Sequence, residues 1–267
     1  MYELMSGAKR FFRNKRRYLL NSALSYSNHP LRALKRYTLI RRSLQPTKYT
    51  KADPFKTVYV DPENIQFAVR DVPTAWGLVV GGNWKRIPFE EITVHGAPLH
   101  ESNILHFDEG VPWEDTPVYE ARMGARGSGP RQLTSVQDVE NYFESLDRLY
   151  ESMRTNGYMS QTQLMGEDQK RTINRNNDEI HPRLNEIGVN IGKSGDILWS
   201  RCGKHRLSIA KILNIDQVSV QVRTRHKEWE QLRRELSSGN CIPARYRSHP
   251  DLTDLVRDSK YERGLDQ

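Results

Sequence analysis

The residues best suited to chemistry form one short run, Gly203, Lys204, His205 and Arg206, between a predicted strand and a predicted apolar helix. The N-terminal end of a helix carries partial positive charge, so cationic side chains are unfavourable in its first turn. A bound anion would compensate for this placement, because free backbone N–H groups, a glycine and an arginine guanidinium together form a phosphate site. The alternative is that the basic side chains extend into water or pair with acids such as Asp178 or Glu179.

Two further pairs of residues are candidates to act with this run. Asp61 and Glu63 follow a predicted strand and could bind Mg²⁺ or activate a hydroxyl, although an Asp-Pro turn also explains Asp61. Arg225 and His226 are predicted to follow the last strand, where strand ends and helix starts would place them near bound phosphates. A solvated strand end is an equal alternative for this second pair.

Other candidates have weaker support. Residues 81–84 could line an acceptor pocket, but a Gly-Gly turn beside core tryptophans explains them as well. Cys202 and His205 are the residue types of a nucleophilic pair, for which the sequence identifies no third member. Cys202 and Cys241 cannot form a disulfide framework and have no C-x-x-C spacing, so we predict no structural zinc site.

Composition limits the class of protein. The chain has 267 residues, of which 36% are hydrophobic, so a polar fraction is expected outside any core. It has no run of about 18 apolar residues and no secretory signal pattern, which predicts a cytoplasmic protein. The net charge of +8 arises from residues 1–50, which hold 12 Lys and Arg against Glu3 alone.

These first 50 residues are predicted to form a basic helical arm interrupted at His29-Pro30. An amphipathic arm can pack its apolar stripe on the rest of the protein. It can also bind nucleic acid or an anionic membrane surface, and the sequence leaves these alternatives open.

Hydrophobic patterns predict the elements that must position the candidate residues. A folded domain is expected over residues 53–236, beginning with a strand at Thr57–Val60 and containing an irregular insertion with short strands at 71–132. Residues 135–155 form the clearest helix, with a capping box at Thr134 and Gln137 and a left-handed stop at Asn156-Gly157.

The second half of this domain is denser in predicted structure. A mobile surface loop at 166–186 precedes a hairpin of strands at 187–191 and 197–199, a buried helix at 207–213, a strand at 218–222 and a helix at 227–236. Residues 237–267 are predicted to be a polar tail with a short helix near 251–262.

In order and spacing these elements resemble the ParB/sulfiredoxin superfamily. The resemblance covers residues 133–226, with GKHRLSIAKIL between strands and VSVQV after it, and VYVDPENI resembles the family's first strand. It implies an α+β fold, a small mixed sheet with packed helices. In this family a glycine, a variable residue and two basic residues hold nucleotide phosphates. The resemblance therefore implies that Gly203, Lys204, His205 and Arg206 bind ATP, ADP or CTP, with Mg²⁺ as a candidate companion.

The chain also differs from the best-known members of the superfamily that it resembles. Lys204 stands where sulfiredoxins have their catalytic cysteine and where partition proteins have a glutamate linked to nucleotide hydrolysis. Partition proteins carry a helix-turn-helix domain after this fold, whereas residues 237–267 are polar, so site-specific DNA binding is not expected. The superfamily includes kinases for free serine.

We therefore expect a nucleotide-binding protein that carries out phosphoryl transfer or nucleotide hydrolysis, with His205, Asp61 and Glu63 as catalytic candidates. The alternative is a non-catalytic nucleic-acid-associated protein that binds through its arm. The oligomeric state, the nucleotide and the acceptor are not predicted.

Overall fold

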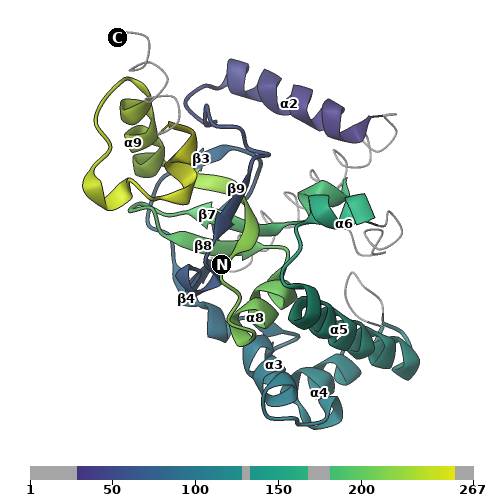
Figure 1. Cartoon of the computed structure of the whole chain (residues 1–267). Coiled ribbons are helices and arrows are strands. Elements are labelled where there is room, and N and C mark those ends of the chain that lie inside the picture. The colour runs from purple at the N-terminus through teal and green to yellow at the C-terminus, as the bar shows by residue number, and fades with distance from the viewer. Residues whose placement is uncertain (1–28, 128–132, 168–180, 256–267) are drawn as a thin grey trace, which may run out of the picture.

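A mixed seven-stranded sheet organises the protein, and helices lie on both sides of it (Figure 1). The structure is a computed structural model that describes residues 29–127, 133–167 and 181–255. The sheet order is β1-β9-β7-β8-β2-β4, and β3 also pairs with β9. The fold is therefore α+β, as the sequence predicted.

The strands are β1 (Thr57–Val60), β2 (Phe67–Val69), β3 (Leu78–Val80), β4 (Arg86–Pro88), β7 (Ile187–Ile191), β8 (Ile197–Arg201) and β9 (Val218–His226). A separate two-stranded hairpin consists of β5 (Thr93–Val94) and β6 (Ala97–Pro98). In the main sheet, β7 and β8 are antiparallel, while β7 and β9 are parallel. Every residue of β7 and β9 is buried, so these two strands form the centre of the sheet.

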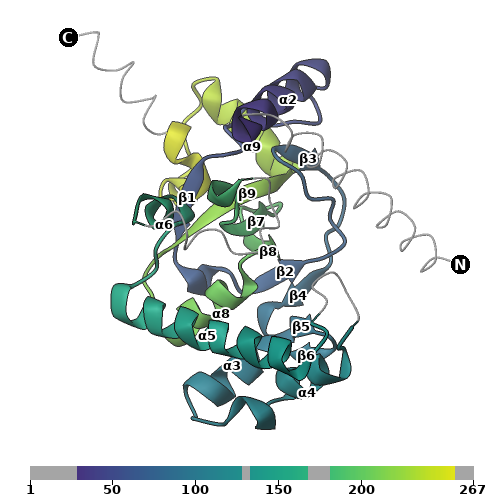
Figure 2. The same cartoon turned by 90° about the vertical axis from the view of Figure 1, so that its right-hand side faces the viewer.

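The helices are α2 (Pro30–Leu44), α3 (Leu99–Phe107), α4 (Pro117–Gly124), α5 (Val136–Asn156), α6 (Gln161–Glu167), α8 (Lys204–Ile212) and α9 (Lys227–Ser237). In both Figure 1 and Figure 2, α3, α4, α5 and α8 lie together below the sheet, and α2 and α9 lie above it. The candidate phosphate run begins α8, so it belongs to the lower group of helices.

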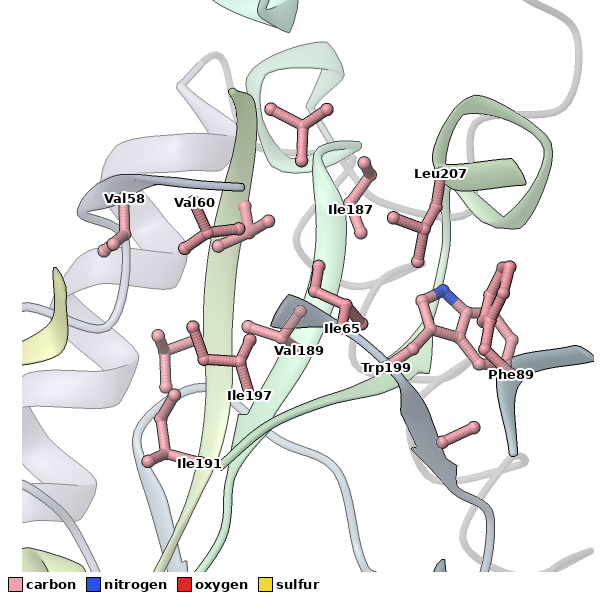
Figure 3. Packing of buried hydrophobic residues seen from close by; sticks show 14 of the residues in the cluster. Val58, Val60, Ile65, Phe89, Ile187, Val189, Ile191, Ile197, Trp199 and Leu207 are labelled. Carbon is pink, nitrogen blue, oxygen red and sulfur yellow. The ribbon is translucent and has the colours of Figure 1, made fainter. Parts of the chain in front are cut away.

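Two hydrophobic clusters hold this arrangement together. The larger joins the sheet to α8, where Leu207 packs near Ile187 and Trp199 (Figure 3). The smaller cluster joins β5 and β6 to α3, α4 and α5, with Trp113 and Phe143 at its centre. Burying apolar surface contributes about 25 cal/mol per Å². The larger cluster therefore stabilises α8 against the sheet and against Met153 of α5, and the smaller one stabilises α4 against α5.

Several predicted elements are confirmed: the first strand, the β7–β8 hairpin, the long helix and the helix after β9. The predicted capping box is wrong by one residue, because Ser135 and Asp138 form it in place of Thr134 and Gln137. The hydrogen bonds from Ser135 within this box, together with two from the backbone N–H and hydroxyl of Thr134, lower the pKa of Asp138 to about 2. The helix does end before Gly157, as predicted, and φ of this glycine is +71°.

Other predictions are wrong. Residues 71–132 contain the helices α3 and α4 as well as short strands, so this segment is not mostly irregular. The last strand continues to His226 and does not end at Val222, because its outer residues pair with β3 and β7. The buried helix starts three residues earlier than predicted, at Lys204.

Parts of three predictions lie outside the described residues: most of the basic arm, the core of the 166–186 loop and the end of the C-terminal segment. Of the arm, α2 buries Leu34 and leaves Leu39, Ile40 and Leu44 exposed. Of the tail, Leu252 is fully buried, so the segment before residue 256 is not merely polar.

Candidate functional site

The entry to α8 depends on two consecutive residues with left-handed backbone. Cys202 has a φ of +56° and Gly203 a φ of +65°, and together they turn the chain from β8 into the helix. A Cβ at position 203 would lie 2.7 Å from Cγ1 of Ile187 and 3.0 Å from its Cα. Glycine is needed here because β7 passes close behind the turn and because the backbone has positive φ.

Cys202 is fixed by its backbone. Its carbonyl oxygen accepts a hydrogen bond of 2.9 Å from Nε1 of Trp199. This bond supports the unfavourable left-handed conformation, which costs a non-glycine residue about 1–2 kcal/mol. The structure thus assigns a local structural role to Cys202.

Arg206, by contrast, points into the protein. Its Nη1 lies 3.5 Å from a carboxylate oxygen of Glu186 and 3.2 Å from the hydroxyl of Tyr158, and its Nη2 donates to the carbonyl oxygen of Asn185. The acid is neither Asp178 nor Glu179, which lie outside the described residues. Arg206 therefore pairs with an acid of the protein, as the alternative to phosphate binding predicted, but the acid is Glu186.

The environment of Glu186 explains why this pairing matters. Its side chain is 1% exposed, and burial raises its pKa although Arg206 acts to lower it. Ser219 and the backbone N–H of Gln161 also donate to this carboxylate, at 2.8 and 2.7 Å. Burial raises the pKa of Tyr158 to about 12, so this phenol stays protonated and can donate as well.

His205 faces the opposite direction and contacts α5. Its Nε2 lies 2.7 Å from the hydroxyl of Tyr142, and the ring of Tyr142 is covered on one face by the guanidinium of Arg122 on α4. The distance from Cζ of Arg122 to the ring centroid is 3.9 Å. Tyr142 thus contacts both the first turn of α8 and an arginine from the segment that was predicted to be irregular.

His95 lies near the same basic groups. It occupies the two-residue turn of the β5–β6 hairpin with Gly96, and both residues have positive φ, as a type I′ turn requires. Burial lowers the pKa of His95, and the charges of Arg122 and Lys204 lower it further. The charges of Arg122 and Lys204 therefore act on the same imidazole.

Asp61 and Glu63 lie at the other end of α8. Glu63 pairs with Lys211 in the last turn of the helix at 3.5 Å, and Asp61 accepts a hydrogen bond of 2.8 Å from the backbone N–H of Glu63. Nine helical residues span about 13 Å. The two carboxylates are thus remote from Lys204 and do not fit as Mg²⁺ ligands for a phosphate held there.

Glu63 instead borders a cavity of about 240 Å³ at the C-terminal end of α8. The cavity is lined by Glu63, Glu90, His100, Ile104, Asp108, Lys211 and Ile212.

The prediction that Arg225 and His226 gather near the phosphate run is wrong. In the parallel pairing of β7 and β9, Ile187 beside Gly203 aligns with Val220, whereas Arg225 aligns with Ile191 at the opposite end of β7. Arg225 forms a buried ion pair of 2.6 Å with Asp251. Both residues are buried within the strand, so they are not a solvated strand end either.

His226 serves the turn that contains the two glycines. Its Nε2 lies 2.9 Å from the carbonyl oxygen of Gly82, and its ring contacts Trp84 edge-on at 5.2 Å between centroids. Its Nδ1 accepts from the backbone N–H of Glu228 and so caps α9. Residues 81–84 therefore lie beside His226, away from the start of α8.

Among the described residues, no group of three or more His, Cys, Asp or Glu side chains has an arrangement that could hold a metal ion. Within the same residues, every helix is too short or too polar to cross a membrane.

Comparison with protein-family models, with curated proteins and with solved structures finds no match for this chain. The candidate site consequently depends on its geometry alone. Gly203, Lys204 and His205 remain together at the start of α8, and Arg122, Tyr142 and His95 join them.

Proposed function

We propose that this protein has a ParB/sulfiredoxin-like fold and binds a nucleotide by its phosphates at the start of α8. The observation that carries the proposal is the start of α8, where Gly203 in left-handed conformation directly precedes Lys204 and His205. An anion at this end would interact favourably with the helix dipole and with these side chains. The buried Arg122 adds a further cation to the same environment.

The order of elements supports the proposed fold. A β7–β8 hairpin leads through Gly203 into α8, and β9 returns beside β7 in parallel, while β1 pairs with β9 on its other side. This is the succession on which the resemblance was based. The superfamily assignment, and the nucleotide that it implies, remain part of the proposal.

Phosphoryl transfer or nucleotide hydrolysis is the proposed use of the site. Among the three catalytic candidates, His205 alone stands at the start of α8, and its bond to Tyr142 orients the imidazole. A histidine there can take the proton of an attacking hydroxyl or water while the bond between the terminal phosphorus and its bridging oxygen breaks. Asp61 and Glu63 have no part in this version of the proposal.

A thermal-shift titration with ATP, ADP and CTP, each with Mg²⁺ and with EDTA, tests the proposal. A ligand that binds only the folded state raises the melting temperature by mass action. Lys204→Ala should reduce the shift, whereas Lys193→Ala removes an equal charge from the β7–β8 turn and should leave it unchanged. Absence of any shift at concentrations well above about a millimolar would refute nucleotide binding.

The alternative function, polyanion binding through residues 1–50, has one supporting observation. Helix α2 contains five basic residues and no acidic one, namely Arg32, Lys35, Arg36, Arg41 and Arg42. The first three of these side chains are exposed. This surface could bind nucleic acid or an anionic membrane whether or not the body of the protein binds a nucleotide.

A further inference from the structure

Arg122 is a buried cation whose charge no described group neutralises. It lies on α4 and is 6% exposed, and its Nε is buried without a hydrogen-bond partner. Within the described part of the chain, no carboxylate forms an ion pair with it. Its one close partner is the face of Tyr142, which attracts a cation but does not satisfy its N–H groups.

The surroundings of Arg122 lead directly to α8. Tyr142, on which Arg122 lies, contacts Nε2 of His205 in the first turn of that helix. The charges of Arg122 and Lys204 also both lower the pKa of His95. Arg122 therefore borders the same small region as the positive end of α8.

Arg122 also supplies what Arg206 does not. A phosphate site uses the planar fork of an arginine, which donates two parallel hydrogen bonds to one anionic group. The fork of Arg206 is occupied by Glu186, Tyr158 and Asn185. The guanidinium of Arg122, unlike that of Arg206, has no carboxylate or carbonyl partner among the described residues, and its Nε is buried without a hydrogen-bond partner.

We propose that Arg122 binds one anionic group of the ligand while Lys204 and the backbone N–H groups at the start of α8 bind an adjacent one. The site would then select a diphosphate or triphosphate over a monophosphate. This inference rests on the proposed function, since it takes the ligand to be a phosphate compound.

The test measures the affinity of the full chain for inorganic pyrophosphate and inorganic phosphate by calorimetry. We expect pyrophosphate to bind at least tenfold more tightly than phosphate. Arg122→Met should weaken pyrophosphate binding about 10- to 100-fold, the range for lost hydrogen bonds to charged groups, and change phosphate binding little. Arg126→Met removes an exposed arginine just beyond α4 and should change neither affinity.

The outcomes separate this inference from the function on which it rests. If the wild-type protein binds nucleotides and Arg122→Met binds pyrophosphate as tightly as wild type does, the role of Arg122 is refuted and nucleotide binding stands. If the wild-type protein binds neither nucleotides nor pyrophosphate, both are refuted.

A second measurement guards against a folding defect in Arg122→Met. The NMR titration of the His95 imidazole reports on this region independently of affinity. Because Arg122 lowers the pKa of His95, Arg122→Met should raise that pKa in a folded variant. Pyrophosphate should raise the pKa of His95 in the wild-type protein, because it brings negative charge beside the ring. An unchanged His95 titration at saturating pyrophosphate would place the ligand elsewhere and overturn the inference.

Discussion

The guanidinium of Arg206 and the carboxylate of Glu186 form an ion pair at 3.5 Å that is almost completely enclosed, since the two side chains are 15% and 1% exposed. Glu186 immediately precedes β7, so the pair ties the first turn of α8 to the centre of the sheet. The last basic residue of the predicted phosphate run is therefore a structural residue. The proposed ligand site at this end of α8 therefore relies on Lys204, His205 and Arg122 and not on Arg206.

Arg206→Ala is accordingly expected to reduce the free energy of unfolding by about 3–5 kcal/mol, because it leaves the buried Glu186 without its cation. Urea denaturation followed by circular dichroism measures this loss. Adding Glu186→Gln to Arg206→Ala should recover part of it, since the uncompensated charge is then absent. A variant with wild-type stability that no longer binds nucleotide would show instead that Arg206 contacts the ligand.

The difference between Arg206 and Arg122 shows what sequence patterns can predict here. A strand, a glycine and a basic helix start form a local pattern. This pattern predicted the turn at Gly203 and the start of α8 to within three residues. The direction of a basic side chain depends on its partners. Glu186 was assigned to a polar loop, and Arg122 belongs to a helix that shows no clear apolar period.

The errors at β9 have a similar cause. Arg225 and His226 are polar residues that would ordinarily end a strand, yet they are buried, with Arg225 paired to Asp251 and His226 bonded to the Gly82 carbonyl oxygen. Asp251 is 26 residues from Arg225 in the sequence. A single sequence contains no signal for such a distant pair, so the strand was predicted too short and its end too exposed.

Asp61→Asn and Glu63→Gln are expected to leave nucleotide binding and any nucleotide turnover within about twofold of wild type. The reason is their location at the far end of α8, about 13 Å from its first turn. Binding and turnover assays on both variants, with Mg²⁺ present, make the comparison. His205→Ala is the positive control. A tenfold or greater loss of nucleotide binding or turnover in Glu63→Gln would show that this carboxylate contributes to the proposed site.

Cys202→Ser should retain nucleotide binding and any turnover. The backbone carbonyl of Cys202, not its thiol, forms the bond to Trp199, so serine can preserve the turn. Nucleotide-dependent activity of Cys202→Ser, measured beside the control Cys241→Ser, checks this expectation. Loss of turnover with unchanged binding in Cys202→Ser alone would indicate thiol chemistry.

The buried Asp251 predicts a loss of stability in acid. Burial acts to raise its pKa, but the charges of Arg225 and Arg233 outweigh burial and lower the pKa from 3.8 to about 2. The folded state therefore binds this proton less tightly than the unfolded state does. Its contribution, about 2 kcal/mol, is complete above about pH 4 and is lost as pH falls through 2.

Urea denaturation of the wild-type protein and of Asp251→Asn between pH 7 and pH 2 measures that contribution. The variant should be less stable than wild type at pH 7, and the difference should shrink as the pH is lowered. Asp216→Asn is the control, because it changes an exposed carboxylate that forms no ion pair with Arg225 or Arg233, and it should match wild-type stability at each pH. A stability difference between Asp251→Asn and wild type that does not vary with pH would contradict this account.

The exposed basic face of α2 provides the last prediction. Arg32, Lys35 and Arg36 lie on the surface of a helix that has no acidic residue, so they add positive charge without internal compensation. Reversing all three to glutamate should lower the salt concentration at which the full chain elutes from heparin, because fewer counterions are released on binding. Reversing the exposed Lys85, Lys227 and Arg247 makes the same change in net charge at other positions and should have a smaller effect. The α2 variant should bind nucleotide at the wild-type level. Equal shifts in elution for the two triple variants would mean that net charge alone governs retention and that α2 is not a specific polyanion-binding surface.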